Sequence, residues 1–205
     1  MAETVALVDY GAGNLHSVEN ALRAVGAEVT VTGDADTVAQ ADRIVLPGVG
    51  SFRACAEGLG ALDGMVEALE QRVLRGGAPF LGICVGMQLL ATRGLEHGEW
   101  AGLDWIAGEV TRIEPVDPAI KVPHMGWNDV TLRNAPPLLE GGEAYFLHSY
   151  RFDASDPASI AATTDHGGPI AAAVARGNIL GVQFHPEKSQ AYGLSLLERF
   201  LEWQP

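Results

Sequence analysis

The stretch PFLGICVGMQLL, residues 79–90, joins an apolar segment to the start of an amphipathic one through a turn that has a glycine on each side of Cys84. Pro79–Ile83 predicts a buried strand, and a helix is expected to begin just after Cys84. A sharp turn leaves no room for a Cβ on either side, which accounts for Gly82 and Gly86. This strand–turn–helix context is that of a nucleophile elbow. The turn would present Cys84 at the positive end of the helix, where the thiolate form is favoured.

Strands and helices are expected to alternate on the N-terminal side of this turn. Three further strands are predicted, at Thr4–Val8, Glu28–Thr32 and Arg43–Leu46. Apolar residues from Val18 to Val25 recur at the spacing of an amphipathic helix, and Ser51 and Asp63 are expected to cap helices that run to about Glu57 and Arg75. This alternation predicts an α/β fold with a central, largely parallel sheet flanked by helices, in a single domain spanning residues 1–205.

The C-terminal half is expected to be rich in β-structure. Short apolar runs separated by Gly, Pro and Asp predict strands at Glu109–Ile113, Asp129–Leu132, Ala144–Leu147, Ile170–Ala175 and Ile179–Gln183. A final amphipathic helix would place Leu194, Leu197 and Leu201 on one stripe that docks on the sheet.

The composition excludes several classes of function. Thirteen Lys and Arg against 26 Asp and Glu give a formal net charge of −13, and no basic cluster is present, so nucleic acid and anionic membrane surfaces are not expected partners. The N-terminus lacks the pattern of a signal peptide, and two cysteines are too few for a disulfide framework. We therefore expect a cytoplasmic protein.

A second segment, QFHPE at residues 183–187, supplies groups that would complete a site around Cys84. Residues two apart in an extended segment project to the same side, so Glu187 could hold the imidazole of His185 in one tautomer. A thiolate nucleophile requires such a base and such an orienting group. Cys55 lies on an amphipathic stretch without an elbow and is expected to be a small buried apolar residue.

These motifs, GICVGMQLL at 82–90 followed by GVQFHPEKS at 181–189, resemble the triad class (class I) of glutamine amidotransferases. Four further motifs narrow the resemblance to the glutaminase subunits of imidazole glycerol phosphate synthases, over essentially the whole chain: YGAGN at 10–14, PGVGSF at 47–52, HMGWN at 124–128 and FLHSY at 146–150. The resemblance implies a flavodoxin-like triad amidotransferase fold. It also implies hydrolysis of glutamine to glutamate and ammonia by Cys84, His185 and Glu187 through a γ-glutamyl thioester.

The resemblance also implies roles for residues around the triad. The amides of Val49 or Gly50 and of Val85 are candidate oxyanion-hole donors, since closely spaced glycines let backbone amides turn toward a ligand. Gln88, Glu96 and the segment His148, Ser149 and Tyr150 would hold the glutamine substrate, with Glu99 as an alternative to Glu96. Asn14, Trp127, Tyr145 and Lys188 would face a (β/α)₈-barrel cyclase subunit in a heterodimer that serves histidine biosynthesis.

Two other readings stay open on the sequence alone. The chain could be the glutaminase subunit of another synthase, such as the one for pyridoxal phosphate, although HMGWN argues against it. A stress-response or binding protein of the same scaffold would have no need of His185 and Glu187 in this register. No cofactor is expected, because His16 stands where a dinucleotide fingerprint needs glycine, and the histidines lack a metal-binding spacing.

Overall fold

A computed structural model describes residues 3–205 of the chain. Met1 and Ala2, the first two residues of the predicted domain, lie outside the described residues. The larger of two sheets has nine strands in the order β2-β1-β3-β4-β13-β12-β11-β8-β9. These are β1 Thr4–Val8, β2 Glu28–Thr32, β3 Arg43–Gly48, β4 Phe80–Cys84, β8 His124–Leu132, β9 Gly142–His148, β11 Ile160–Asp165, β12 Pro169–Arg176 and β13 Ile179–Val182.

The half of this sheet formed by β2-β1-β3-β4-β13 is parallel throughout. Its order matches the flavodoxin-like, doubly wound arrangement, in which ligands bind at the carboxyl ends of the strands. Every residue of β3, β4 and β13 is buried, as expected of parallel strands covered on both faces. The predicted fold class, an α/β domain with a largely parallel central sheet, is confirmed.

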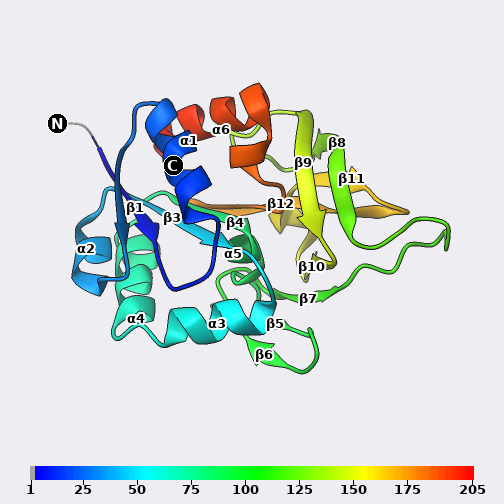
Figure 1. The fold of residues 1–205 in the computed structure, drawn as a ribbon, viewed down its shortest axis with the longest axis horizontal. Coiled ribbons are helices and arrows are strands. Elements are labelled where there is room, and N and C mark those ends of the chain that lie inside the picture. Colours follow the sequence, from blue (N-terminus) through cyan, green and yellow to red (C-terminus); the bar gives the residue numbers. More distant parts are fainter. Residues whose placement is uncertain (1–2) are drawn as a thin grey trace.

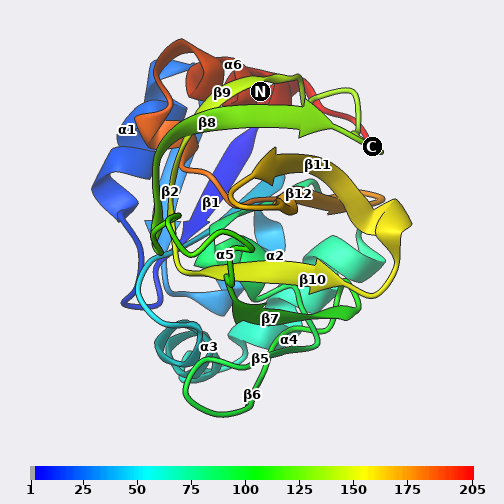
Figure 2. The same cartoon turned by 90° about the vertical axis from the view of Figure 1, so that its right-hand side faces the viewer.

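From β13 the same sheet continues through antiparallel pairs to β9 at its edge. A second sheet of four strands has the order β10-β7-β5-β6, with β5 Arg93–Gly94, β6 Trp100–Ala101, β7 Gly108–Arg112 and β10 Tyr150–Ala154. Figure 2 shows β10 and β7 running below β8 and β9, so the chain crosses from one sheet to the other between β9 and β10.

The helices cover both faces of the parallel half. They are α1 Leu15–Ala24, α2 Ala35–Gln40, α3 Phe52–Gly60, α4 Met65–Leu69, α5 Val85–Gln88 and α6 Gln190–Glu202, with the π-helical segment η1 Glu70–Arg75 and the 3-10 turns η2 Pro157–Ser159 and η3 Pro186–Lys188. Figure 1 shows α1 and α6 on one side of the sheet and α2, α3 and α4 on the other.

Several local expectations are corrected by the structure. Ser51 does cap α3, accepting from the Ala54 N–H at 3.2 Å, but α4 begins after Gly64 rather than Asp63. The short helix α2 and the strands β5, β6, β10 and β11 were not expected. On α6, Leu197 is buried and Leu201 packs against the core as predicted, but Leu194 is exposed. The rest of the buried face consists of Gly193, Leu196 and Phe200.

No helix among residues 3–205 is long and apolar enough to cross a membrane.

Candidate active site

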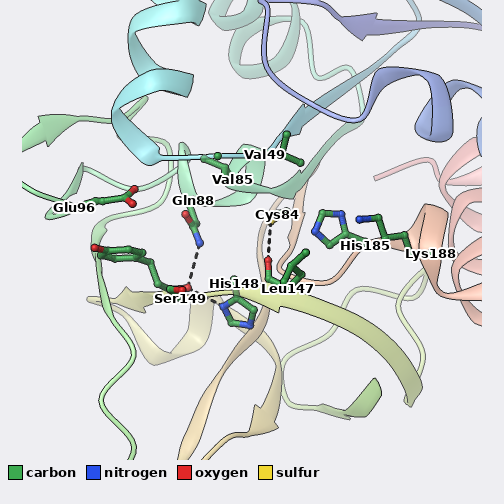
Figure 3. A pocket seen from close by; sticks show the side chains of 12 residues that line it. Val49, Cys84, Val85, Gln88, Glu96, Leu147, His148, Ser149, His185 and Lys188 are labelled. Atoms are coloured by element: carbon green, nitrogen blue, oxygen red, sulfur yellow. Dashed lines mark hydrogen bonds between the residues drawn. The ribbon is translucent and has the colours of Figure 1, made fainter. Parts of the chain in front are cut away.

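The sequence-predicted catalytic groups lie at the carboxyl ends of three neighbouring parallel strands, β3, β4 and β13. Cys84 is the last residue of β4 and pairs in register with Gly48, the last residue of β3. On the other side of β4, β13 ends at Val182, three residues before His185. Figure 3 shows Cys84 between Val49 and Val85 above and Leu147 below, with His185 beside it.

The turn at Cys84 has the strained geometry of a nucleophile elbow. Cys84 has φ 55° and ψ −111°, a conformation that L residues rarely adopt. A Cβ on Gly82 would lie 2.6 Å from the Gly86 carbonyl oxygen, and one on Gly86 would lie 1.9 Å from the Leu46 carbonyl oxygen. Glycine is therefore required on both sides of Cys84 by close backbone packing.

His185 and Glu187 form a buried pair. Nδ1 of His185 lies 2.9 Å from Oε1 of Glu187, and their side chains are only 3% and 1% exposed. Burial alone would lower the pKa of His185, but its interactions with Cys84 and Glu187 outweigh this and raise the pKa to about 9. His185 is therefore charged at neutral pH, between the Cys84 sulfur and the Glu187 carboxylate.

The backbone around His185 is fixed by β9. The His185 N–H donates to the Tyr145 carbonyl at 2.9 Å. The buried Ser189 hydroxyl donates to the His185 carbonyl at 2.7 Å and accepts from the Tyr145 N–H at 2.9 Å. The imidazole is therefore carried by a backbone that hydrogen bonds hold to a strand of the large sheet.

Cys84 and His185 open into a cavity of about 160 Å³. The lining includes all the predicted oxyanion and substrate residues, as well as one residue predicted at the partner interface: Val49, Gly50, Cys84, Val85, Gln88, Glu96, Leu147, His148, Ser149, Tyr150, His185 and Lys188. Four of the six sequence motifs, PGVGSF, GICVGMQLL, FLHSY and GVQFHPEKS, thus contribute residues to one cavity.

Gln88 lies one helical turn after Cys84, and internal bonds orient its amide. Its Nε2 donates to the Tyr150 carbonyl at 3.2 Å and to Oε1 of Gln183 at 3.0 Å. Gln183 in turn directs its own Nε2 toward the Cys84 sulfur at 3.7 Å. These bonds link Gln183, which follows β13, to both ends of α5, at Gln88 and at Cys84.

The structure distinguishes Glu96 from Glu99. Glu96 lines the cavity, and its Oε2 accepts from the Phe52 N–H at 2.7 Å, at the start of α3. Glu99 is exposed and pairs with Arg93 at 3.1 Å, and it is not among the lining residues. Glu96 is therefore the carboxylate that faces the cavity.

The segment after β3 carries the other candidate oxyanion donors. The Val49 carbonyl accepts from the Cys55 thiol at 3.5 Å, so the Gly50 N–H of the same trans peptide points away from Cys55. Tyr10 donates to the Pro47 carbonyl at 2.5 Å. Val85 is the first residue of α5, where the N–H has no partner within the helix.

The four residues predicted to face a partner lie around the mouth of the cavity and along β8 and β9. Trp127 and Tyr145 are register partners on these strands, and their rings meet edge to face at 6.1 Å between centroids. Trp127 is 47% exposed. Lys188 lines the cavity, and Asn14 precedes α1, which packs against η3.

Sequence reasoning did not assign a role to three residues that shape the site: Tyr10, Gln183 and Ser189. Tyr10 acts through a tertiary hydrogen bond to the Pro47 carbonyl, and Gln183 through tertiary bonds to Gln88 and Cys84. Ser189 joins the His185 carbonyl to the Tyr145 N–H. All three lie inside or beside quoted motifs, and this position was the only sequence signal for a role in the site. Across residues 3–205, no group of three or more His, Cys, Asp and Glu side chains could hold a metal ion.

Comparison with known families places residues 6–203 within the model described as "Glutamine amidotransferase class-I". The chain is 60% identical to "Imidazole glycerol phosphate synthase subunit HisH" of Zymomonas mobilis, covering 100% of this chain and 98% of that protein. It is 53% identical to the protein of the same name from Caulobacter vibrioides, covering 99% and 100%.

Solved structures share the fold at lower sequence identity. A structure described as "Crystal structure of glutamine amidotransferase" has a TM-score of 0.75 at 20% identity and covers 96% of this chain and 97% of its own. "Structure of PurLQS from Thermotoga maritima" has a TM-score of 0.71 at 19% identity, covering 98% and 99%.

Proposed function

The chain belongs to the class-I glutamine amidotransferase family, and from this premise we propose that it is the glutaminase subunit of an imidazole glycerol phosphate synthase in histidine biosynthesis. The observation that carries the proposal is that Cys84, on its elbow, and His185 line one cavity, while Glu187 forms a buried ion pair with His185. The relatives at 50–60% identity, all named as HisH subunits, support the choice of synthase. We infer one amidotransferase domain over residues 1–205.

The chemistry begins with attack of the Cys84 sulfur on the side-chain amide carbon of glutamine. The resulting oxyanion would accept hydrogen bonds from the Val85 amide and from the amide of Val49 or Gly50, all of which border the cavity. Collapse of the tetrahedral intermediate breaks the carbon–nitrogen bond, and His185 gives its proton to the leaving ammonia. A γ-glutamyl thioester on Cys84 remains.

Water then completes the cycle. His185, now neutral, accepts a proton from the attacking water, and cleavage of the thioester releases glutamate and restores Cys84. Glu187 holds Nδ1 of His185 throughout, which leaves Nε2 for proton transfer. The raised pKa of His185 suits this order of steps, because His185 of the free enzyme already holds the proton that is given to ammonia.

Substrate binding falls to the remaining lining residues. Glu96 offers a carboxylate for the α-ammonium group of glutamine, and the backbone of His148, Ser149 and Tyr150 offers polar groups for its carboxylate. Gln88 is fixed by Tyr150 and Gln183 and borders the same space. Both cysteines are free thiols, and the reducing cytoplasm would keep Cys84 in that form.

The ammonia requires an acceptor, which we propose is a cyclase subunit of (β/α)₈-barrel form, in a heterodimer with this chain. The support is an exposed apolar surface on β8 and β9 beside the cavity, formed by Met125, Trp127 and Leu147 with Tyr145. Strand alternation points all four outward, while Lys188 connects this surface to the site. Aromatic anchors of this kind are typical of interface hot spots.

A reconstitution experiment tests the proposal. The chain is mixed with an untagged barrel cyclase, and copurification, glutamate release and formation of imidazole glycerol phosphate from glutamine are measured. We expect a complex that makes product from glutamine. Copurification with the barrel subunit of a pyridoxal phosphate synthase instead, or no glutamate release in any complex, would overturn it.

A further inference from the structure

Two buried histidines connect strand β8 to the segment that lines the cavity. His124 is the first residue of β8, and its Nδ1 lies 3.0 Å from Nε2 of His148 at the end of β9. Nδ1 of His148 lies 2.8 Å from the Tyr150 carbonyl. At the other end of the chain of bonds, Nδ2 of Asn128 lies 3.0 Å from Nε2 of His124 and 2.8 Å from the Asp165 carbonyl.

The direction of every bond in this chain follows from its two ends. The Tyr150 carbonyl can only accept, so Nδ1 of His148 carries the proton, and its Nε2 accepts when the ring is neutral. His124 must then donate from Nδ1, which leaves its Nε2 to accept from the amide of Asn128. The two rings are thereby assigned the same tautomer, with the proton on Nδ1.

The surroundings keep both rings neutral. Burial is the main cause that lowers the pKa of His124, to about 3, with His148 and His166 adding to the shift. Burial also lowers the pKa of His148, to about 4; His166 and His185 lower it further, and the bond to the Tyr150 carbonyl opposes them. His124 also stacks on Phe146 and on His166, with ring centroids 4.6 and 4.2 Å apart.

The chain of bonds ends at the substrate cavity. The same Tyr150 carbonyl that accepts from His148 also accepts from Gln88, and Gln88 continues through Gln183 to the Cys84 sulfur. His148 and Tyr150 line the cavity, whereas His124 does not. The orientation of one backbone carbonyl thus depends on His148 on one side and on Gln88 on the other.

We propose that His124 is a positioning residue for glutamine binding, which holds His148 in its Nδ1-protonated tautomer and so fixes the Tyr150 carbonyl and Gln88. This inference rests on the proposed function, because it assigns substrate to that cavity. His124 itself touches no substrate. Without the N–H of His124, Nε2 of His148 has no hydrogen-bond partner and the His148 ring is free to reorient. The segment 148–150 then loses its defined geometry.

The tautomers are tested directly by nitrogen NMR of the imidazole rings in the full chain at neutral pH. We expect His124 and His148 both to carry the proton on Nδ1 and to lack it on Nε2. A proton on Nε2 of His148, or two protons on either ring, would overturn the proposal. This measurement uses the unsubstituted protein and needs no variant to fold.

The positioning role is tested by glutamine kinetics in the presence of saturating cyclase. His124→Phe keeps a ring that can stack on Phe146 and His166 but cannot donate. We expect the KM for glutamine to rise about three- to tenfold, the equivalent of one lost hydrogen bond, with kcat changed by less than about twofold. His124→Asn, whose amide nitrogen takes the place of Nδ1, should restore KM, and His124→Gln should not.

His16→Phe is the matched control, because it makes the same change on the exposed side of α1 and should leave KM and kcat unchanged. An unchanged KM in folded His124→Phe, or equal losses in the Asn and Gln variants, would overturn the positioning role while the glutaminase assignment stands. Absence of glutamate release from the unsubstituted complex would instead overturn the proposed function, and the substrate role of His124 with it.

Discussion

Gly48 and Cys84 face one another as register partners at the carboxyl ends of two adjacent parallel strands, β3 and β4. This pairing places the start of the segment from Gly48 to Gly50 beside the candidate nucleophile. A Cβ at Gly48 would lie 2.7 Å from the Gly86 nitrogen and 2.9 Å from both the Tyr10 hydroxyl and Cβ of Val85. The two elements that would stabilise an oxyanion are therefore packed against each other.

Gly48→Ala is expected to lower the free energy of unfolding by about 1–3 kcal/mol, the range for overpacking, and to reduce glutamate release. Denaturant unfolding and steady-state glutaminase assays measure the two effects. Gly60→Ala at the end of α3 is the control, because a Cβ there meets nothing within 4 Å. Similar behaviour of the two variants would contradict the packing argument.

Glu187→Gln is expected to keep the fold and to lower glutaminase kcat by roughly 10²–10⁴-fold, the usual contribution of a proton-transfer role. The reason is that His185 loses the carboxylate that orients Nδ1 and stabilises its charge. Glutamate release in saturating glutamine measures the effect. An unchanged rate would show that this carboxylate has no part in catalysis.

The pKa of His185 predicts a pH dependence of stability. The pKa is raised from its ordinary value of 6.5 to about 9, so between these values the folded chain holds a proton that the unfolded chain releases. The free energy of unfolding should therefore fall as the pH rises from about 6.5 to about 9. Denaturant titrations across this range should show a shallower fall in Glu187→Gln, and equal slopes would refute the assignment.

The isolated chain is expected to hydrolyse glutamine poorly, and the cyclase, most of all with its own ligand bound, to raise the rate. Gly50 has φ 97°, and a single peptide in the segment from Gly48 to Gly50 can rotate at little cost. One missing oxyanion donor costs about 2.7–4 kcal/mol, or roughly 10²–10³ in rate. Glutamate release is compared for the chain alone, with cyclase, and with liganded cyclase. Equal rates would exclude control of the oxyanion hole by the cyclase.

The parallel core could be predicted from sequence because its signals are local. β1 and β2 were predicted with their observed bounds, since both are short β-branched runs next to glycine or turn residues. The helix α2 was missed because only Val38 is buried among its six residues, which leaves no apolar period to detect. The stripe of α6 was partly misplaced because Gly193 packs against the Pro186 carbonyl, a contact that no hydropathy pattern records.

The residues of the site were found from motifs, but their connections were not. The motifs named Gln88 and His148, yet the Tyr150 carbonyl that both contact is a backbone atom without a sequence signal. Ser189 ties His185 to Tyr145 only because β9 lies beside η3 in the fold. The sequence favoured Glu96 but left Glu99 as an alternative, and the approach of α3 to Glu96 distinguishes the two.

The most direct test of the account is the Cys84→Ala variant in the reconstituted complex, with imidazole glycerol phosphate formation measured from glutamine and, separately, from ammonium salts. Because only the release of ammonia requires the thiol, synthesis from glutamine should be lost while synthesis from ammonium salts stays at the unsubstituted level. Ordinary glutamine-dependent turnover in this variant would contradict the assignment of Cys84 as the nucleophile, and loss of both activities would contradict the division of labour between the two subunits.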